Sequence, residues 1–295
     1  MLELKKQEKK MATFFNQASL SFNGRITNSN VTTGELVETA TASKTAIIGE
    51  YRANGTVSYL INLVNNGQTA LTGVTISDNL GAYTLADGVT TVYPLEYLDG
   101  SARLFVNGVL AAAPTVSAGP PLVLSGITVP PSSNAYIVYE ANVTEYAPLE
   151  SGSTITNTAT VNGIQPTEVE ISATTSADEY TELTIAKAIC PATVTDNSEL
   201  TYTFIIQNSG NTPVEFSDNI LISDTFAPIL NPITVTYNGF AWTEGVNYTY
   251  DETTGAFAST AEQISVPAAT YTQDPATGVI TVTPGVTVIT VTGTV

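Results

Sequence analysis

The chain of 295 residues has no histidine and a single cysteine. Without histidine it cannot form a Ser–His–Asp or Cys–His catalytic arrangement, or bind a metal ion through imidazole. The lone Cys190 excludes a disulfide framework within the chain. We expect Cys190 to be a small buried hydrophobic residue, the alternative being a disulfide between subunits. No glycine-rich phosphate loop is present either, so we predict no enzyme activity, no cofactor and no metal site.

Charge is scarce, and positive charge is the scarcest. Only 12% of the residues are charged, and nine Lys and Arg residues against 27 Asp and Glu residues give a formal net charge of −18. Backbone phosphates would repel such a surface, which argues against a nucleic-acid partner. An anionic membrane surface is disfavoured for the same reason. We expect the acidity to keep the protein soluble and to prevent random association.

Long apolar runs are also missing. No run near the N-terminus is long enough for a signal peptide, and no run elsewhere is long enough to span a bilayer. We therefore expect no membrane insertion, and a route out of the cell other than the usual export signal. The first ten residues hold four of the nine basic residues, and we predict that residues 1–11 form a disordered tail.

Strand patterns fill most of the remaining sequence. Apolar and polar residues alternate in "TVSYLINLVN" (56–65), "AYIVYEANV" (135–143) and "LTYTFIIQN" (200–208), and no long segment has helical periodicity. Turn dipeptides such as Asn66-Gly67 and Asn238-Gly239 separate the runs. This pattern is typical of an antiparallel β-sandwich, so the sequence predicts an all-β fold.

The strand pattern occurs twice. "ASKTAI" (42–47) matches "IAKAIC" (185–190), and "GVTISDNL" (73–80) matches "NILISDTF" (219–226). Lys44 precedes Tyr59 by the same number of residues as Lys187 precedes Tyr202. We therefore predict two tandem Ig-like antiparallel β-sandwich modules. The predicted divisions are a tail (1–11), an N-terminal donor strand (12–24), a linker (25–40), module 1 (41–165), a second linker (166–182) and module 2 (183–295).

The ends of the two modules differ. Module 1 closes with "TNTATVNG" (156–163), whereas module 2 stops at Val295 without such a strand. A similar stretch, "FFNQASLSFNG" (14–24), lies at the N-terminus, where Asn16 aligns with Asn157 and Leu20 with Val161. A sandwich that lacks a strand exposes unpaired backbone groups and an open groove, and such an edge recruits a strand.

The N-terminal stretch has the side chains to fill that groove. At a period of two, one face carries the assembly residues Phe14, Asn16, Ala18, Leu20 and Phe22. Insertion into module 2 of a neighbouring subunit would be donor-strand complementation. Because the contact is head-to-tail, it would generate a ring or an open fibre, and we expect the fibre, a homopolymer of this chain. The alternative is that residues 12–24 fold back onto their own chain.

Each module also carries residues suited to a self-forming isopeptide bond. That chemistry needs a buried Lys, an Asn on a neighbouring strand and an acid between them. Burial lowers the pKa of the amine and raises that of the acid, which then shuttles protons while the Asn loses ammonia. The candidates are Lys44, Asp78 and Asn157 in module 1, and Lys187, Asp224 and the next subunit's Asn16 for module 2. The alternatives are plain Lys–Asp pairs, lysines that reach water, and an Asn that only caps a strand end.

The order of these motifs resembles a known bacterial family. A Lys on the opening strand, then "Y-x-I-x-x-x-N-x-G", "I-S-D" and a closing "I-T-N-x-A-x-V" are similar to the conserved-repeat surface domain, catalogued as domain of unknown function eleven. Related two-module proteins form appendages on spores of anaerobic spore formers. The resemblance implies an extracellular or spore-surface fibre, released by lysis of the mother cell rather than by a signal peptide. The alternative function is a monomeric adhesin or carbohydrate-binding surface module.

Overall fold

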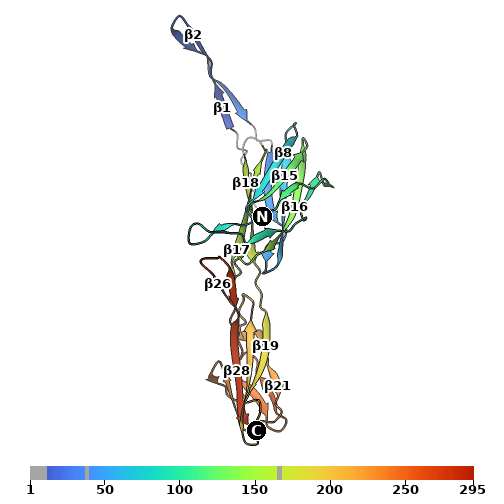
Figure 1. The fold of residues 1–295 in the computed structure, drawn as a ribbon, viewed down its shortest axis with the longest axis vertical. Coiled ribbons are helices and arrows are strands. Elements are labelled where there is room, and N and C mark those ends of the chain that lie inside the picture. Colours follow the sequence, from blue (N-terminus) through green and yellow to red (C-terminus); the bar gives the residue numbers. More distant parts are fainter. Residues whose placement is uncertain (1–11, 37–39, 165–167) are drawn as a thin grey trace. The chain divides into compact units, whose positions relative to one another are not determined.

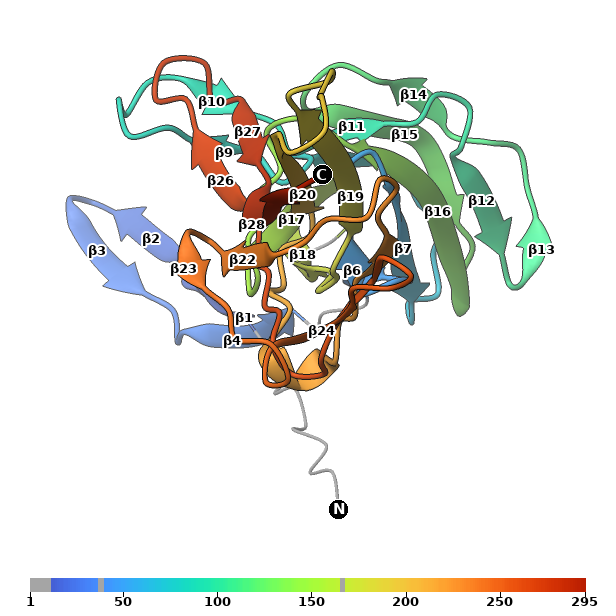
Figure 2. The same ribbon diagram turned by 90° about the horizontal axis from the view of Figure 1, so that it is seen from below.

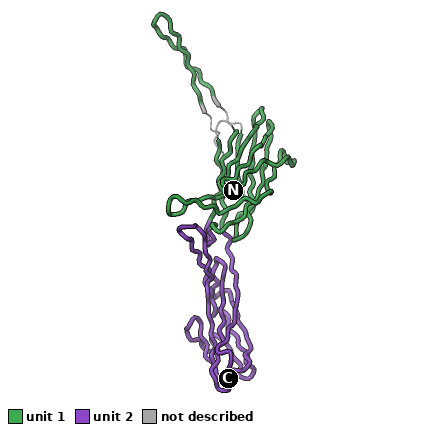
Figure 3. Tube along the Cα trace, viewed as in Figure 1, with its two compact units in different colours: residues 1–147, 154–176 green, residues 148–153, 177–295 purple. Residues whose placement is uncertain are grey.

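The computed structural model describes residues 12–36, 40–164 and 168–295. The chain divides into two compact units, coloured separately in Figure 3. Unit 1 comprises residues 1–147 and 154–176, and unit 2 comprises residues 148–153 and 177–295. In the described residues the elements are β-strands, apart from one short 3-10 helix, η1 (Phe216–Asp218). The prediction of an all-β chain with two sandwich modules is confirmed.

The N-terminal residues form a long two-stranded arm, drawn in blue in Figure 1. Its strands are β1 (Ala12–Asn16), β2 (Ser19–Phe22), β3 (Arg25–Asn28) and β4 (Thr32–Leu36). β1 pairs with β4, and β2 pairs with β3. The turn residues Asn23 and Gly24 both have positive φ angles, 49° and 76°, which an Asn-Gly hairpin turn requires. Residues 25–28 and 32–36 are therefore strand, and the prediction of a linker over residues 25–40 is wrong for them.

Module 1 consists of two antiparallel sheets, and Figure 2 shows strands β13, β12 and β16 of the first one side by side. The first sheet has the order β13 (Val109–Leu110), β12 (Arg103–Val106), β16 (Ser133–Val143), β7 (Thr56–Asn65) and β5 (Ala40–Ala46), with β11 (Leu95–Tyr97) also on β16. The second has the order β14 (Thr115–Ser117), β15 (Leu122–Val129), β8 (Leu71–Asp78), β17 (Thr154–Asn162), β18 (Val169–Ala177) and β6 (Glu50–Tyr51). A small ribbon pairs β9 (Tyr83–Thr84) with β10 (Thr91–Val92).

Strand β18 corrects the second predicted linker. Residues 169–177 pair along the whole of β17 and so extend the second sheet of module 1. Their side chains alternate between exposed and buried, with Ile171 and Ala173 facing inward. The segment was predicted as linker because its small polar residues give a weak strand signal. Residues 165–167 lie outside the described residues.

Module 2 repeats the first sheet of module 1 strand by strand. The order is β19 (Leu183–Cys190), β20 (Glu199–Asn208), β28 (Gly285–Thr294), β22 (Ile233–Tyr237) and β23 (Phe240–Ala241). Its second sheet has only β21 (Ser223–Thr225), β25 (Ala256–Ser259) and β24 (Tyr248–Asp251), beside a ribbon of β26 (Thr270–Gln273) and β27 (Ile280–Thr283).

The second sheets of the two modules differ in one respect that matters for the site. Strand β21, which carries Asp224, corresponds to β8, which carries Asp78, and each pairs with the next strand of its own sheet on one side. On its other side β8 pairs with β17, and β18 follows. Within residues 168–295, β21 is instead the edge strand of its sheet. Within those residues, module 2 therefore has no counterpart of β17 or β18.

Each module has its own core, built by the alternation of the long strands. Strand β7 alternates strictly between buried and less buried residues along "TVSYLINLVN", and β20 does the same along "ELTYTFIIQN". The core of module 2 centres on aromatic rings, with Phe226 packed against Tyr202 and Phe257. In the turns of module 2, Asp251 accepts the backbone N–H of Thr253 and Asp274 accepts that of Ala276.

Candidate functional site

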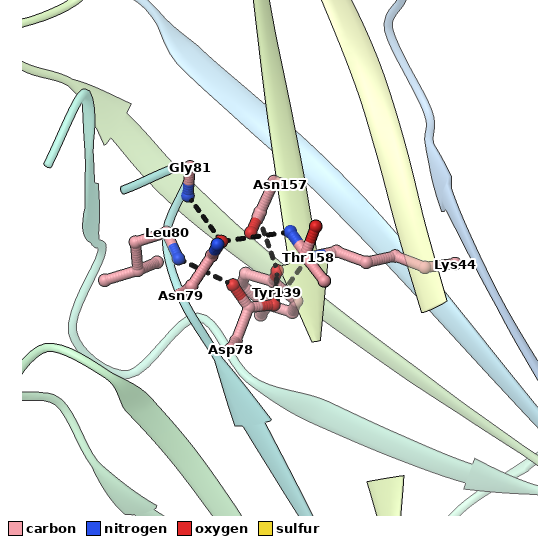
Figure 4. Close-up of polar contacts among 8 residues, drawn as sticks. All are labelled: Lys44, Asp78, Asn79, Leu80, Gly81, Tyr139, Asn157 and Thr158. Atoms are coloured by element: carbon pink, nitrogen blue, oxygen red, sulfur yellow. Dashed lines mark hydrogen bonds and ion pairs between the residues drawn. The ribbon is translucent and has the colours of Figure 1, made fainter. Parts of the chain in front are cut away.

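Lys44 and Asp78 form an ion pair inside module 1 (Figure 4). Lys44 lies on β5 and Asp78 ends β8, so the pair bridges the two sheets. The Nζ–Oδ2 distance is 2.6 Å, and both side chains are 0% exposed. The other oxygen of Asp78 accepts the backbone N–H of Leu80 at 3.0 Å. The structure thus brings together two residues that the sequence predicted to meet.

Burial changes the acidity of the Lys44 amine. Desolvation lowers the pKa of Lys44 to about 8, even though the charge of Asp78 and its hydrogen bond act in the opposite direction. Two aromatic rings lie beside the amine, with Nζ 4.8 Å from the ring centre of Tyr59 and 5.9 Å from that of Tyr139. Their π faces stabilise the charged form. A substantial fraction of this lysine is therefore neutral, and hence nucleophilic, in mildly alkaline solution.

Tyr139 connects Asp78 to Asn157, the third predicted residue. Its hydroxyl donates to Asp78 Oδ2, and it accepts a hydrogen bond from Asn157 Nδ2 at 3.1 Å. Burial, and then the nearby Asp78 charge, raise the pKa of Tyr139 well above its usual value, so it stays protonated. Tyr139 is not among the site residues predicted from the sequence. The available signal was its polar hydroxyl at an inward-facing position of "AYIVYEANV".

Asn157 completes the cluster from strand β17. Its side chain is fully buried, and its Oδ1 atom accepts no hydrogen bond from the described residues. A buried acceptor without a donor costs about 1–3 kcal/mol, so its presence needs an explanation. The oxygen sits on the carboxamide carbon that a nucleophilic amine would attack. Lys44, Asp78, Tyr139 and Asn157 form one connected buried network.

The chemistry available to this cluster is amide exchange. The neutral Lys44 amine would attack Cγ of Asn157 and form a C–N bond. Protonated Asp78 would donate its proton to the departing amide nitrogen and recover one from the attacking amine. The C–Nδ2 bond would break and ammonia would leave, so that one amide replaces another without any oxidant or reductant. Buried Lys–Asp pairs also exist without further chemistry, and the geometry fits that role too.

In module 2 the corresponding pair is open to solvent. Lys187 on β19 pairs with Asp224 on β21, but their side chains are 40% and 20% exposed. Nζ lies 4.4 Å from the ring centre of Tyr202, as Lys44 lies over Tyr59. Among residues 168–295, no asparagine takes the place of Asn157, because none of these residues forms a strand beside β21 on that side. Asn16, the residue proposed to supply that group, lies on β1 in the other unit.

The hydroxyl of Tyr139 has no counterpart either. In module 1, Tyr139 stands opposite Tyr59 in the β16–β7 register, and the ring centres are 5.4 Å apart. In module 2 the corresponding partner of Tyr202 is Val291. The two sites therefore share the Lys and the Asp. In module 2, Val291 stands where Tyr139 links the acid to the amide in module 1.

The predicted assembly residues lie on the exposed arm. Phe14, Leu20 and Phe22 are 58%, 65% and 72% exposed, and Asn16 and Ala18 are exposed as well. Large apolar side chains gathered on one segment in this way usually mark a contact surface. Cys190 is also exposed, so the expectation that it is buried is wrong. It ends β19 at the rim of its sheet, where no second layer covers it.

In residues 12–36, 40–164 and 168–295, no helix is long and apolar enough to cross a membrane. No model of a protein family matches the sequence, and no curated protein matches it. The resemblance to the conserved-repeat surface domain therefore stays a prediction.

Several solved structures of bacterial surface proteins are similar in fold. The C-terminal domain of an antigen I/II-family protein of Streptococcus pyogenes is 12% identical, with coverage of 87% of this chain and 92% of that chain and a TM-score of 0.35. The pilus backbone of Streptococcus pneumoniae is 12% identical, with coverage of 83% and 55% and a TM-score of 0.33. The collagen-binding subdomain of the Enterococcus faecalis surface protein ACE is 11% identical, with coverage of 46% and 95% and a TM-score of 0.32. At these scores, nothing about what this chain binds or builds follows from the likeness.

Proposed function

We propose that this chain is a structural subunit that polymerises head-to-tail into an extracellular or spore-surface fibre. The N-terminal segment of one subunit enters module 2 of the next by donor-strand complementation. The observation that carries the proposal is that the second sheets of the two modules differ in extent. The second sheet of module 2 stops at β21, where that of module 1 continues, and the chain carries a spare, exposed apolar segment whose sequence resembles β17.

Edge chemistry supports this pairing. The backbone groups of Ile222 and Asp224 point toward β25. The backbone N–H and C=O groups of the alternate residues, Ser223 and Thr225, therefore point toward the open edge of β21. In module 1 the matching residue Asn79 donates its N–H to Thr158 of β17 at 2.9 Å. In the free subunit the N–H of Thr225, the residue that matches Asn79, donates to Asp224 Oδ1 at 2.8 Å. An entering strand aligned like β17 would take over that N–H. Backbone pairing would give affinity, and the inward side chains would give register.

The test is the assembly of a chain that lacks residues 1–24. We expect it to fold, since residues 13–24 are exposed and outside both cores, and to remain monomeric in sedimentation and electron microscopy. The complete chain should form filaments at the same concentration. Filaments of the truncated chain would overturn the proposal and favour a monomeric or otherwise associated surface module.

We propose further that the joint is locked by an isopeptide bond between Lys187 and Asn16 of the neighbouring subunit. An entering strand aligned like β17 would bring Asn16 to the Lys187–Asp224 pair, as β17 brings Asn157 to Lys44 and Asp78. Asn16→Ala should leave assembly intact but make the filaments dissociate in hot detergent. The matched control Asn157→Ala removes only the bond within module 1 and should leave the filaments resistant. Equal resistance of Asn16→Ala and parent filaments would exclude the lock.

A further inference from the structure

Strand β19 exposes apolar side chains that belong to a core. Leu183, Ile185 and Ile189 are 41%, 58% and 45% exposed. They alternate with Thr184, Ala186 and Ala188, so they point to one face of the strand together with Lys187. In the β19–β20 register, Ile185 and Ile189 stand beside the buried residues Ile206 and Tyr202 of β20. The exposed face of β19 therefore continues the core of module 2 rather than its outer surface.

In module 1 the matching strand is covered. Strand β5 has the same register to β7 as β19 has to β20, and on β5 Ala40 and Lys44 are buried. The hydrogen bond from Tyr139 to Asp78 joins β16 to β8 across the two sheets. With the sheets aligned at that point, their strand orders bring β17 over β7 and β18 over β5. On its outer side β18 pairs with β6, which follows β5 along the chain, and Ser176 donates its N–H to the carbonyl of Gly49 beside that pairing at 2.8 Å. In this alignment two strands, not one, complete the module.

The N-terminal arm has both of these strands. In module 1, β17 and β18 are consecutive and pair with Asn157 opposite Ala173, and in the arm β1 and β4 pair with Asn16 opposite Thr32. An Asn-Gly sequence follows β17 and also links the two sides of the arm. The Phe14 ring lies directly over Gly34 across the strand pair, so the two strands are matched to each other.

We propose that the donated element is the whole hairpin of residues 12–36, in which β1 and β2 take the place of β17 and β4 takes the place of β18 over β19 of the next subunit. This inference rests on the proposed head-to-tail assembly and names its second strand. A single donated strand would cover β20 and leave the apolar face of β19 in water. The hairpin covers both.

One change in the size of the facing side chains agrees with this placement. At the positions of Ala40, Ala42 and Ala46 in β5, strand β19 has the larger Leu183, Ile185 and Ile189. By the Asn16–Asn157 alignment, Gly34 of β4 takes the place of the larger Thr175 of β18, while Thr32 takes the place of the smaller Ala173. A close-packed interior tolerates large residues on one layer where the facing layer is small.

The first experiment replaces residues 25–36 with a Gly/Ser segment of equal length, which keeps residues 12–24 and the reach of the arm unchanged. We expect the critical concentration for filament formation to rise at least ~10-fold, because the face of β19 stays in water. The comparison is the chain lacking residues 1–24. If that truncated chain is monomeric while the replaced chain assembles like the parent, one strand suffices and the hairpin inference is overturned. If both assemble like the parent, the proposed function itself fails.

The second experiment places a charge on the face that β4 would cover. Ile185 is exposed in the free subunit, so Ile185→Asp should fold normally. Under the hairpin the carboxylate would be forced against apolar groups, so assembly should weaken at least ~10-fold. The control Thr184→Asp puts the same charge on the opposite face of β19 and should assemble like the parent. Equal assembly of the two variants would leave β19 uncovered and contradict the hairpin.

Discussion

At the scale of single residues, the Lys44 network of module 1 is a polar island in an apolar core. A buried ammonium is tolerated because Asp78 is 2.6 Å away and two tyrosine rings flank it. The same contacts prepare an amine of lowered pKa beside an amide whose oxygen has no donor among the described residues. A purely structural ion pair does not need that amide.

Tyr139 should matter more than its neighbour Tyr59. Tyr139→Phe removes the donor to Asp78 and the acceptor of Asn157, and should lower the free energy of unfolding of module 1 by about 1–3 kcal/mol. Tyr59→Phe is the control, because the Tyr59 hydroxyl lies near Thr175 and Asn157 but makes no hydrogen bond of ordinary geometry. It should change that free energy by less than about 0.5 kcal/mol. Denaturant unfolding measures both, and equal effects would show that the hydroxyl network contributes no stability.

The rate of bond formation in module 1 should fall at alkaline pH. The productive state has a neutral Lys44 and a protonated Asp78. It carries the same number of protons as the ion pair, so both states lose the same proton as pH rises. That proton is lost as pH rises through the Lys44 pKa of about 8. Ammonia loss after refolding, followed by mass spectrometry, should be constant near pH 6–7 and roughly tenfold slower by pH 9. A tenfold rise over the same range would mean that Asp78 does not act as the acid.

The sequence predicted this site better than its counterpart in module 2. Lys44, Asp78 and Asn157 could be chosen because their strands repeat and the chain has few other lysines. Tyr139 was missed because an inward tyrosine in a strand resembles any other core aromatic. Lys187 is exposed because the described part of module 2 has no counterpart of β17 or β18. The sequence predicts only the first of these differences, the missing counterpart of β17.

At the scale of elements, the arm and the β17–β18 hairpin have similar pairing. Asn16 lies opposite Thr32 in the arm, and Asn157 lies opposite Ala173 in module 1. The prediction of strand over residues 12–24 agrees with β1 and β2. The segment "RITNSNVTTGEL" (25–36) predicts a linker because it has many small polar residues and little apolar alternation. Their pairing partner, already in the chain, is what makes them strands. The strand propensity of a short segment depends on what it pairs with, so composition alone does not reveal these strands.

The two faces of the arm should respond differently to charge. Phe14→Asp lies on the face that carries Asn16, and it should abolish or strongly weaken assembly because that face enters the neighbouring core. Phe15→Asp lies on the opposite face and is the matched control, since both rings are exposed in the free subunit. Light scattering and electron microscopy measure the outcome. Loss of assembly in both variants, or in neither, would contradict an inserted face.

At the scale of the whole molecule, the net charge of −18 acts against association. Identical subunits repel one another, so apolar and backbone contacts must exceed that repulsion. Raising the salt concentration from about 0.01 M to 0.15 M shortens the Debye length from about 30 Å to about 8 Å. We therefore expect the critical concentration to fall with added salt. A rise would indicate that attraction between opposite charges drives the assembly.

The most direct test of the account uses filaments grown from equal parts of unlabelled and nitrogen-15-labelled subunits. The filaments are boiled in detergent with reductant, separated on a denaturing gel and digested for mass mapping. We predict a ladder of covalent oligomers, and a peptide pair joining Lys187 to Asn16 with one ammonia lost and with labelled and unlabelled halves mixed. A single monomer band would contradict the covalent joint. A linked pair in which both halves always carry the same label would show that the arm folds back onto its own chain, and would contradict head-to-tail assembly.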